Sequence, residues 1–206
     1  MSIRRAAKSG PKPAPRRRRS AGEAKSEALA SARKLLLEKG PDAVTLKAVA
    51  ADLGTSHTNL LHHFGTAAEL QSALMGAMVR DLAAALEKAV AHLRSDSGAL
   101  RELVDIVFDA FEKGGAGQLA AWIALSGNLG QLASVREAVS ELVKAVEEKF
   151  VHEAGDPHQG VTSAVLFLAL MAFGDSVIGP PLKDMLERER AASRKIASFL
   201  LPKFFL

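Results

Sequence analysis

Apolar residues recur at helical spacing along nearly the whole chain from residue 23 onward. In residues 26–39 they fall three, four and seven positions apart, which places them on one face of a helix that Gly40 and Pro41 would end. The pattern repeats in residues 46–53 after Thr45, a residue type that caps helix starts. The sequence has no convincing run of alternating β-branched residues, so we expect no sheet. The pattern predicts an all-α fold of about nine helices.

Two of the predicted helices are short and are joined by a tight turn that contains Gly54. The first of them is the helix of residues 46–53, and the second is predicted over residues 56–63, with Leu60 and Phe64 one turn apart on its inner side. Two short helices across such a turn, preceded by another helix, form a helix-turn-helix, whose second helix normally lies in the major groove of DNA. Its outer side would carry groups that reach base edges, and the hydroxyls at its start suit phosphate. These exposed residues are His57, Thr58, Asn59 and His62, with Thr55 and Ser56 at the helix start.

A long fourth helix is predicted from residues 66–69, where Thr66 and Glu69 have the spacing of a capping box. Its apolar residues recur about every four positions up to residue 93. Further helices are predicted over residues 100–113, 118–125, 133–153, 158–173 and 182–200, with breaks at glycine and proline that include residues 179–181. We therefore expect three parts: a disordered basic arm at 1–22, a DNA-binding domain at 23–70 and a larger helical domain at 71–206.

Charge is distributed unevenly along the chain. The net charge is +4, yet residues 1–22 hold eight Lys and Arg and no acid, so the remainder has 19 basic and 23 acidic residues. The prolines and the few apolar residues of this segment predict disorder. Its four consecutive arginines, Arg16, Arg17, Arg18 and Arg19, are candidates for contacts with DNA phosphates. The alternative is a solubilising tail.

The composition excludes several other classes of protein. The chain has no cysteine, which removes disulfides, thiolate metal sites and cysteine nucleophiles, and it lacks a secretory signal pattern, so we expect a cytoplasmic protein. Residues 161–182 are long and apolar enough to span a membrane, but their polar residues and the Gly-Pro-Pro break favour a helix buried in the protein core. The sequence contains no catalytic or nucleotide-binding motif. His57, His62 and His63 do not share one helix face, so no enzyme, metal site or cofactor is predicted.

Three segments together resemble a known family, the tetracycline-repressor (TetR) type of regulator: residues 32–40 (ARKLLLEKG), 45–50 (TLKAVA) and 60–64 (LLHHF). The resemblance covers about residues 26–75, and it rests on order, spacing and glycine positions rather than on any one segment. The remaining two thirds resemble the family only as helices of suitable length. The resemblance implies an all-helical homodimer with a three-helix DNA-binding domain and a larger domain for dimerisation and ligand sensing. Its implied partners are double-stranded operator DNA and a small-molecule inducer.

The resemblance also implies roles for individual residues. It implies base-edge contacts from His57, Thr58, Asn59 and His62, and phosphate contacts from Thr45 and His63. Two positions depart from the family pattern, because Leu61 stands where a phosphate-binding tyrosine is usual and Ala67 where a lysine is common. Residues 55–68 contain no Lys or Arg at all, which leaves the arm as the obvious source of affinity for the DNA backbone.

In the larger domain, the side chains that could line a ligand pocket could equally be ordinary core: Phe108, Phe111, Trp122, Phe167 and Met171. Asp175 lies in an apolar run, and it could mark a helix end, pair with Arg188 or Arg190, or face the pocket. Asp105 and Asp109 lie off their helix's apolar stripe and are predicted to be solvated. Residues 161–173 are apolar on nearly every side, which predicts a dimer through the last two helices.

Three functions are consistent with these features. The one we favour is a repressor that a small, mostly apolar ligand releases from a palindromic operator. The second is a DNA-binding protein of the same fold that does not repress, such as an activator or an architectural protein. The third is a helical ligand-binding or adaptor protein that has lost DNA binding, and the departures at Leu61 and Ala67 keep it open.

Overall fold

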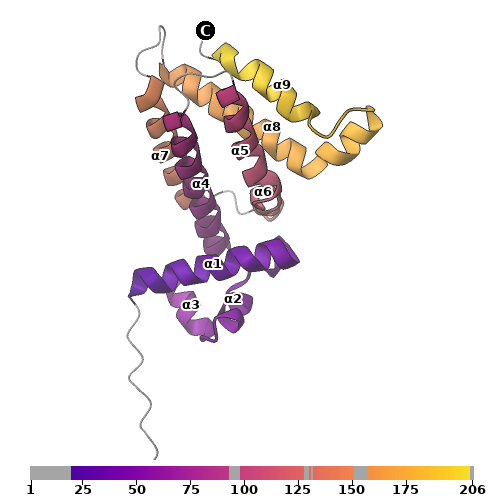
Figure 1. Ribbon diagram of the computed structural model, residues 1–206. Helices are drawn as coiled ribbons and strands as arrows, with labels where there is room; N and C mark the ends of the chain where they lie inside the picture. Colours follow the sequence, from indigo (N-terminus) through magenta and orange to yellow (C-terminus); the bar gives the residue numbers. More distant parts are fainter. Residues whose placement is uncertain (1–19, 93–97, 128–129, 131, 151–156, 205–206) are drawn as a thin grey trace, which may run out of the picture.

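A computed structural model describes residues 20–92, 98–127, 130, 132–150 and 157–204, and within these ranges every regular element is a helix. The all-α prediction is therefore confirmed, with nine α-helices in the described part of the chain. Figure 1 shows α1, α2 and α3 grouped at one end of the molecule and α5 to α9 at the other, with the long helix α4 joining the two groups.

The first helix, α1, spans Ala21–Lys39 and begins earlier than the predicted start at residue 26. That prediction is wrong because Ser20 and Glu23 form a capping box: the Glu23 N–H donates to Ser20 Oγ at 3.1 Å, and the Ser20 N–H donates to the Glu23 carboxylate at 2.8 Å. Residues 20–22 thus belong to a capped helix, not to the predicted arm of 1–22. Residues 1–19, with Arg16 to Arg19, lie outside the described residues.

The next two helices follow the prediction closely. Gly40, with a φ of +90°, ends α1 and leads through a 3₁₀ turn, η1 (Pro41–Ala43), to α2 (Leu46–Asp52). Gly54, with a φ of +61°, makes the tight turn to α3 (His57–Phe64). A positive φ is strained for residues with a Cβ, so the two glycines set the angles between these short helices. Their shared core contains Leu36, Val49, Leu60 and Phe64.

Five long elements and two short ones form the rest of the molecule: α4 (Ala67–His92), α5 (Gly98–Glu112), α6 (Ala116–Leu125), α7 (Ala133–Phe150), α8 (Pro157–Met185), α9 (Ala192–Leu200) and η3 (Leu201–Phe204). The predicted capping box starts α4, since the Thr66 N–H donates to the Glu69 carboxylate at 2.8 Å and the Glu69 N–H to Thr66 Oγ at 3.1 Å. Helix α4 packs along α7, and α5 packs on α8 and α9. A second hydrophobic core lies between these helices.

Helix α8 contradicts the predicted break at residues 179–181. It continues through Pro180 and Pro181 to Met185, and Figure 1 shows that it bends along its length. A proline lacks an N–H donor and kinks a helix, but it does not end one when the surrounding contacts hold the next turn. Here Lys183, one turn beyond, is tied back to Asp175. The single helix predicted over 182–200 is therefore also wrong, because α8 ends first and α9 begins only at Ala192.

Much of α8 lies open to solvent in the single chain. The segment His158–Met185 is long and apolar enough to cross a membrane by length and composition, and only 17% of its most apolar window is buried. The expectation of a helix enclosed by the protein core is thus wrong for one copy of the chain. Its exposed apolar residues continue onto α9 and include Leu166, Leu170, Val177, Ile178, Leu182, Met185, Ile196 and Phe199. We call this set the α8–α9 face.

Candidate nucleic-acid interface and ligand cavity

Helix α3 is held by one apolar side and presents a mostly polar opposite side. Leu60 and Phe64 are 2% and 6% exposed and pack against α1, α2 and α4. Successive residues of a helix differ by about 100°, so Thr58 and His62 point directly away from this buried side. Both are exposed, as are His57, Asn59 and Leu61, whereas His63 is half-buried. The predicted helix-turn-helix is therefore present, and its second helix carries the outward groups that base edges require.

Three hydroxyl groups predicted to contact phosphate already have partners within the chain. Ser56 Oγ accepts from the Asn59 N–H at 3.2 Å, and Thr45 Oγ1 accepts from the Ala48 N–H at 3.1 Å. Thr55 Oγ1 accepts from Asn59 Nδ2 at 3.2 Å. Each hydroxyl keeps its own hydrogen for a further acceptor such as a phosphate oxygen. These hydrogen bonds therefore hold the three hydroxyl groups in place and leave each O–H free to donate.

The start of α1 lies beside one flank of α3. Thr55, Asn59 and His63 border a shallow groove whose other wall includes Ser20 and Ala24. The residue that follows the four arginines is therefore next to the candidate DNA-binding helix. This position was not predictable from the sequence, because the contact joins segments about 40 residues apart in the chain.

Two groups of contacts attach the helix-turn-helix to its neighbours. The buried Gln71 of α4 donates through Nε2 to the Val44 carbonyl at 3.1 Å. Asp52, at the end of α2, accepts from Lys34 and from Ser31, each at 2.8 Å. The hydrogen bonds from Lys34 and then Ser31 lower the pKa of Asp52. Gln71 thus links α4 directly to the segment that precedes α2.

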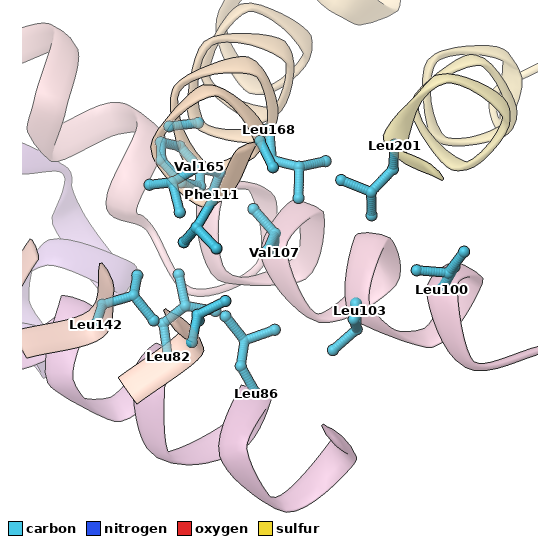
Figure 2. A pocket seen from close by; sticks show the side chains of 14 residues that line it. Leu82, Leu86, Leu100, Leu103, Val107, Phe111, Leu142, Val165, Leu168 and Leu201 are labelled. Carbon is cyan, nitrogen blue, oxygen red and sulfur yellow. The ribbon is translucent and has the colours of Figure 1, made fainter. Parts of the chain in front are cut away.

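An apolar cavity of about 110 Å³ lies inside the larger group of helices. Figure 2 shows side chains from α4, α5, α7 and α8, together with Leu201 of η3, surrounding it. Every lining residue is apolar: Leu82, Leu86, Leu100, Leu103, Val107, Phe111, Leu142, Val146, Val161, Ala164, Val165, Leu168, Ala169 and Leu201. Such a cavity suits an apolar group and offers no partner for a charged one.

Of the residues predicted to line a pocket, only Phe111 lines this cavity. Phe108, on another face of α5, is 2% exposed in the core, and the Arg194 guanidinium lies over its ring. Phe167 stacks against Phe204 with ring centroids 5.1 Å apart, and Met171 packs at the edge of the same core. Trp122 lies at the surface of α6, 36% exposed. Helices α5 and α8 of the prediction do line the cavity, mostly through other faces, whereas α6 with Trp122 does not line it. Which apolar side meets a gap depends on how the helices pack.

Asp175 is paired, but with Lys183 and not with the predicted Arg188 or Arg190. Its carboxylate accepts from Lys183 at 2.8 Å and from Ser193 Oγ at 2.6 Å, and both ionic side chains are at most 14% exposed. The helix-end alternative fails because α8 continues beyond this residue, and Asp175 borders a polar groove rather than the apolar cavity.

Asp105 and Asp109 are not simply solvated, contrary to the prediction. Arg194 of α9 donates to Asp105 at 3.1 Å, to Asp109 at 2.7 Å and to Glu112 at 2.9 Å. We call this set the Arg194 clamp. Burial alone would lower the pKa of Arg194, but the three carboxylates raise it above its usual value. Three acids spaced four and three residues apart on α5 are a signal that sequence reasoning could have used.

Residues 28–74 match the family model for bacterial regulatory proteins of the tetR family. This N-terminal segment matches the TetR family. The TetR match covers all of α2 and α3, most of α1 and the start of α4. No curated protein sequence is significantly similar to the chain.

Solved structures described as transcriptional regulators share the fold along nearly the whole chain. A transcriptional regulator from Rhodococcus sp. RHA1 has 16% identity and a TM-score of 0.65, over 87% of this chain and 95% of that one. Thermus thermophilus FadR, a TetR-family repressor in complex with lauroyl-CoA, has 13% identity and a TM-score of 0.62, over 88% and 95%. The TetR-family repressor AlkX from Dietzia sp. strain DQ12-45-1b has 17% identity and a TM-score of 0.61, over 87% and 94%. At such identities the likeness shows the fold alone.

Proposed function

We propose that the chain is a cytoplasmic transcriptional repressor that binds a palindromic operator and is released by a small, mostly apolar molecule. The outward side of α3 carries the DNA-binding half of this proposal. Thr58 and His62, opposite the buried side, would meet base edges, with His57 and Asn59 beside them. Phosphate contacts would come from the hydroxyls of Thr45, Thr55 and Ser56 and from the half-buried His63. This function requires neither catalysis nor a metal or cofactor.

The α8–α9 face supports a homodimer. Soluble proteins rarely leave so many apolar side chains of two adjacent helices open to water, so a second copy is the natural cover. In a dimer with two-fold symmetry, the same surface of both copies forms the interface, and the dimer presents two copies of α3. The operator should then have two inverted half-sites about one turn of DNA, or a multiple of it, apart.

The arm is proposed to supply the cations that α3 lacks. Arg16 to Arg19 precede Ser20, which lies beside Asn59 and His63. A segment of this length starting there can reach neighbouring phosphates or the minor groove. If each arm neutralises about three phosphates, deleting residues 2–19 from both subunits should reduce the slope of log affinity against log salt by about five. Ser20 is kept so that the α1 cap survives. An unchanged slope would show that the arm is a solubilising tail.

The apolar cavity is the proposed ligand site. It lies against α4, whose other end is joined to the helix-turn-helix through Gln71 and Val44. A ligand that widened the cavity would tilt α4 and change the spacing of the two α3 helices, which lowers affinity for one fixed operator spacing. The lauroyl-CoA complex of Thermus FadR and the link of AlkX to n-alkane degradation support an aliphatic ligand.

Replacing Ala164 by Leu would place an isopropyl group in the cavity. Binding of aliphatic compounds, followed by Trp122 fluorescence or calorimetry, should be lost while DNA binding is kept. Unchanged ligand binding by this variant would place the ligand elsewhere.

The DNA-binding proposal is tested by selecting sequences from random double-stranded DNA with the full-length protein. Enrichment of an inverted repeat is expected, and a Thr58→Ala, His62→Ala variant should lose it. Failure of the wild-type protein to enrich any sequence would favour the adaptor function. A promoter reporter carrying the selected site then distinguishes repression, in which the protein lowers output, from activation, in which it raises output.

A further inference from the structure

One flank of α3 carries a large apolar side chain, Leu61, which is 45% exposed. It lies one turn after His57 and next to His62, among polar residues. The apolar positions that hold α3 in place are already filled by Leu60 and Phe64. Leu61 is therefore not needed for the core of this domain, and leaving a leucine in water is unfavourable.

Leu61 also lies on the open flank of the helix. At 100° per residue it is on the opposite flank from Asn59 and His63, which border the groove next to the start of α1. Within the described residues, neither hydrophobic core includes it. If α3 lies in a major groove, this flank faces DNA.

The chemistry of the major groove offers one apolar group to such a side chain. Phosphates and most base-edge groups need a hydrogen-bond partner, and leucine has none. The 5-methyl group of thymine is the exception, and it distinguishes thymine from the other bases. We propose that Leu61 is a specificity-determining residue that reads one thymine in each half-site by packing against its 5-methyl group. This inference rests on the proposed DNA-binding function.

The test uses the full-length protein and the operator selected from random DNA. Each thymine of the two half-sites is replaced in turn by deoxyuridine, which removes the methyl group and keeps the base pair. For the wild-type protein, we expect one symmetric pair of thymines to be sensitive to this replacement. Deoxyuridine at one of the two should lower operator affinity about fourfold, and at both about fifteenfold. Other thymines should have smaller effects.

The variant Leu61→Ala should bind the thymine and deoxyuridine operators equally, while Leu61→Met, which keeps an apolar side chain, should still discriminate. Alanine favours helix and the site is exposed, so both variants should melt at nearly the wild-type temperature. The control Leu125→Ala changes a leucine that is 88% exposed on α6. This variant should distinguish the thymine operator from the deoxyuridine operator as well as the wild-type protein does.

The two proposals fail in different ways. If no sequence is enriched, the DNA-binding function itself fails, and the role of Leu61 falls with it. If an operator is enriched but has no thymine that matters through its methyl group, or if Leu61→Ala still discriminates, the role of Leu61 is overturned while the function stands.

Discussion

The two ends of the molecule differ in how completely each buries its own apolar surface. In the TetR-type domain Leu36, Val49 and Leu60 are at most 2% exposed, and the starts of its helices are capped by side chains. In the larger domain Leu166 and Leu170 are each 61% exposed, and a cavity lies within the core. Both ends are helical, so the difference lies in packing rather than in secondary structure.

This difference indicates what each end needs. The first is complete within one chain, which suits the rigid element that the proposed DNA-binding role requires. The second has an uncovered face and an unfilled cavity, which a second copy and a ligand would complete. Binding of a second copy or of a ligand would stabilise this end, because a partner that binds only the folded state shifts the equilibrium toward it.

The largest effect is expected at the α8–α9 face. Replacing both Leu166 and Leu170 by Glu would bury carboxylates without partners in the dimer, at a cost of several kcal/mol. Light scattering at micromolar concentration should then report 21.8 kDa rather than twice that mass, and operator affinity should fall at least a hundredfold. The control Leu125→Glu, at an exposed position of α6, should stay dimeric. A dimeric double variant would place the interface elsewhere.

The next effect compares one buried leucine with one at the cavity. Leu60→Ala should reduce the free energy of unfolding by about 3 kcal/mol, because it opens a cavity in a filled core. Leu82→Ala enlarges a gap beside a half-buried side chain and should cost about 1 kcal/mol. Urea unfolding of both variants measures the difference. Equal losses would mean that the two cores are equally well packed.

How far the sequence predicts the structure follows the same division. In the TetR-type domain, the caps Thr45 and Thr66 and the turn at Gly54 act within a few residues, so local pattern places α2, α3 and the start of α4 correctly. The orientation of Thr58 and His62 also followed from the inward Leu60. The cap at Ser20 is an equally local signal that was missed, because the arm's composition suggested disorder.

In the larger domain the decisive contacts lie far apart in the chain. Arg194 is 89 residues from Asp105 and 85 from Asp109, and the cavity joins residues of four helices and η3. Local pattern indicates a helix on each side of such a contact but not which faces meet. Pro180 and Pro181 were read as a break for the same reason, since the pairing of Asp175 with Lys183 across that region is a tertiary contact.

A smaller effect is expected from the Arg194 clamp. Arg194→Met removes the cation that Asp105, Asp109 and Glu112 share, although Asp109 keeps Lys113. We expect it to reduce the free energy of unfolding by about 2 kcal/mol at neutral pH. Lys195→Met, which breaks a more exposed pair with Glu189, should cost less. A loss no greater than that of Lys195→Met would show that the clamp contributes little to stability.

The clamp should also depend on pH. Burial raises the pKa of Asp109, but hydrogen bonds from Lys113 and Arg194 outweigh it and lower the pKa overall. Its stabilising contribution is therefore full above the unfolded pKa of about 3.9 and is lost as the pH falls through the lower folded value. The difference in melting temperature between the wild type and Arg194→Met should narrow as the pH falls below about 4. A constant difference down to pH 2 would exclude Asp109 as the titrating group.

The smallest effect concerns the start of α1, where the sequence and the structure disagree. Ser20→Ala removes the oxygen that accepts from the Glu23 N–H and should cost about 1 kcal/mol, most of it in the first turn. Hydrogen exchange of the amides at residues 21–25 should become faster, while the salt slope of operator binding stays the same because the arm keeps its charges. The matched variant Ser26→Ala changes a serine within α1, at the start predicted from the pattern, and should be neutral or slightly stabilising. If Ser26→Ala were the more costly change, α1 would begin at residue 26, and the arm would no longer be anchored beside Asn59 and His63.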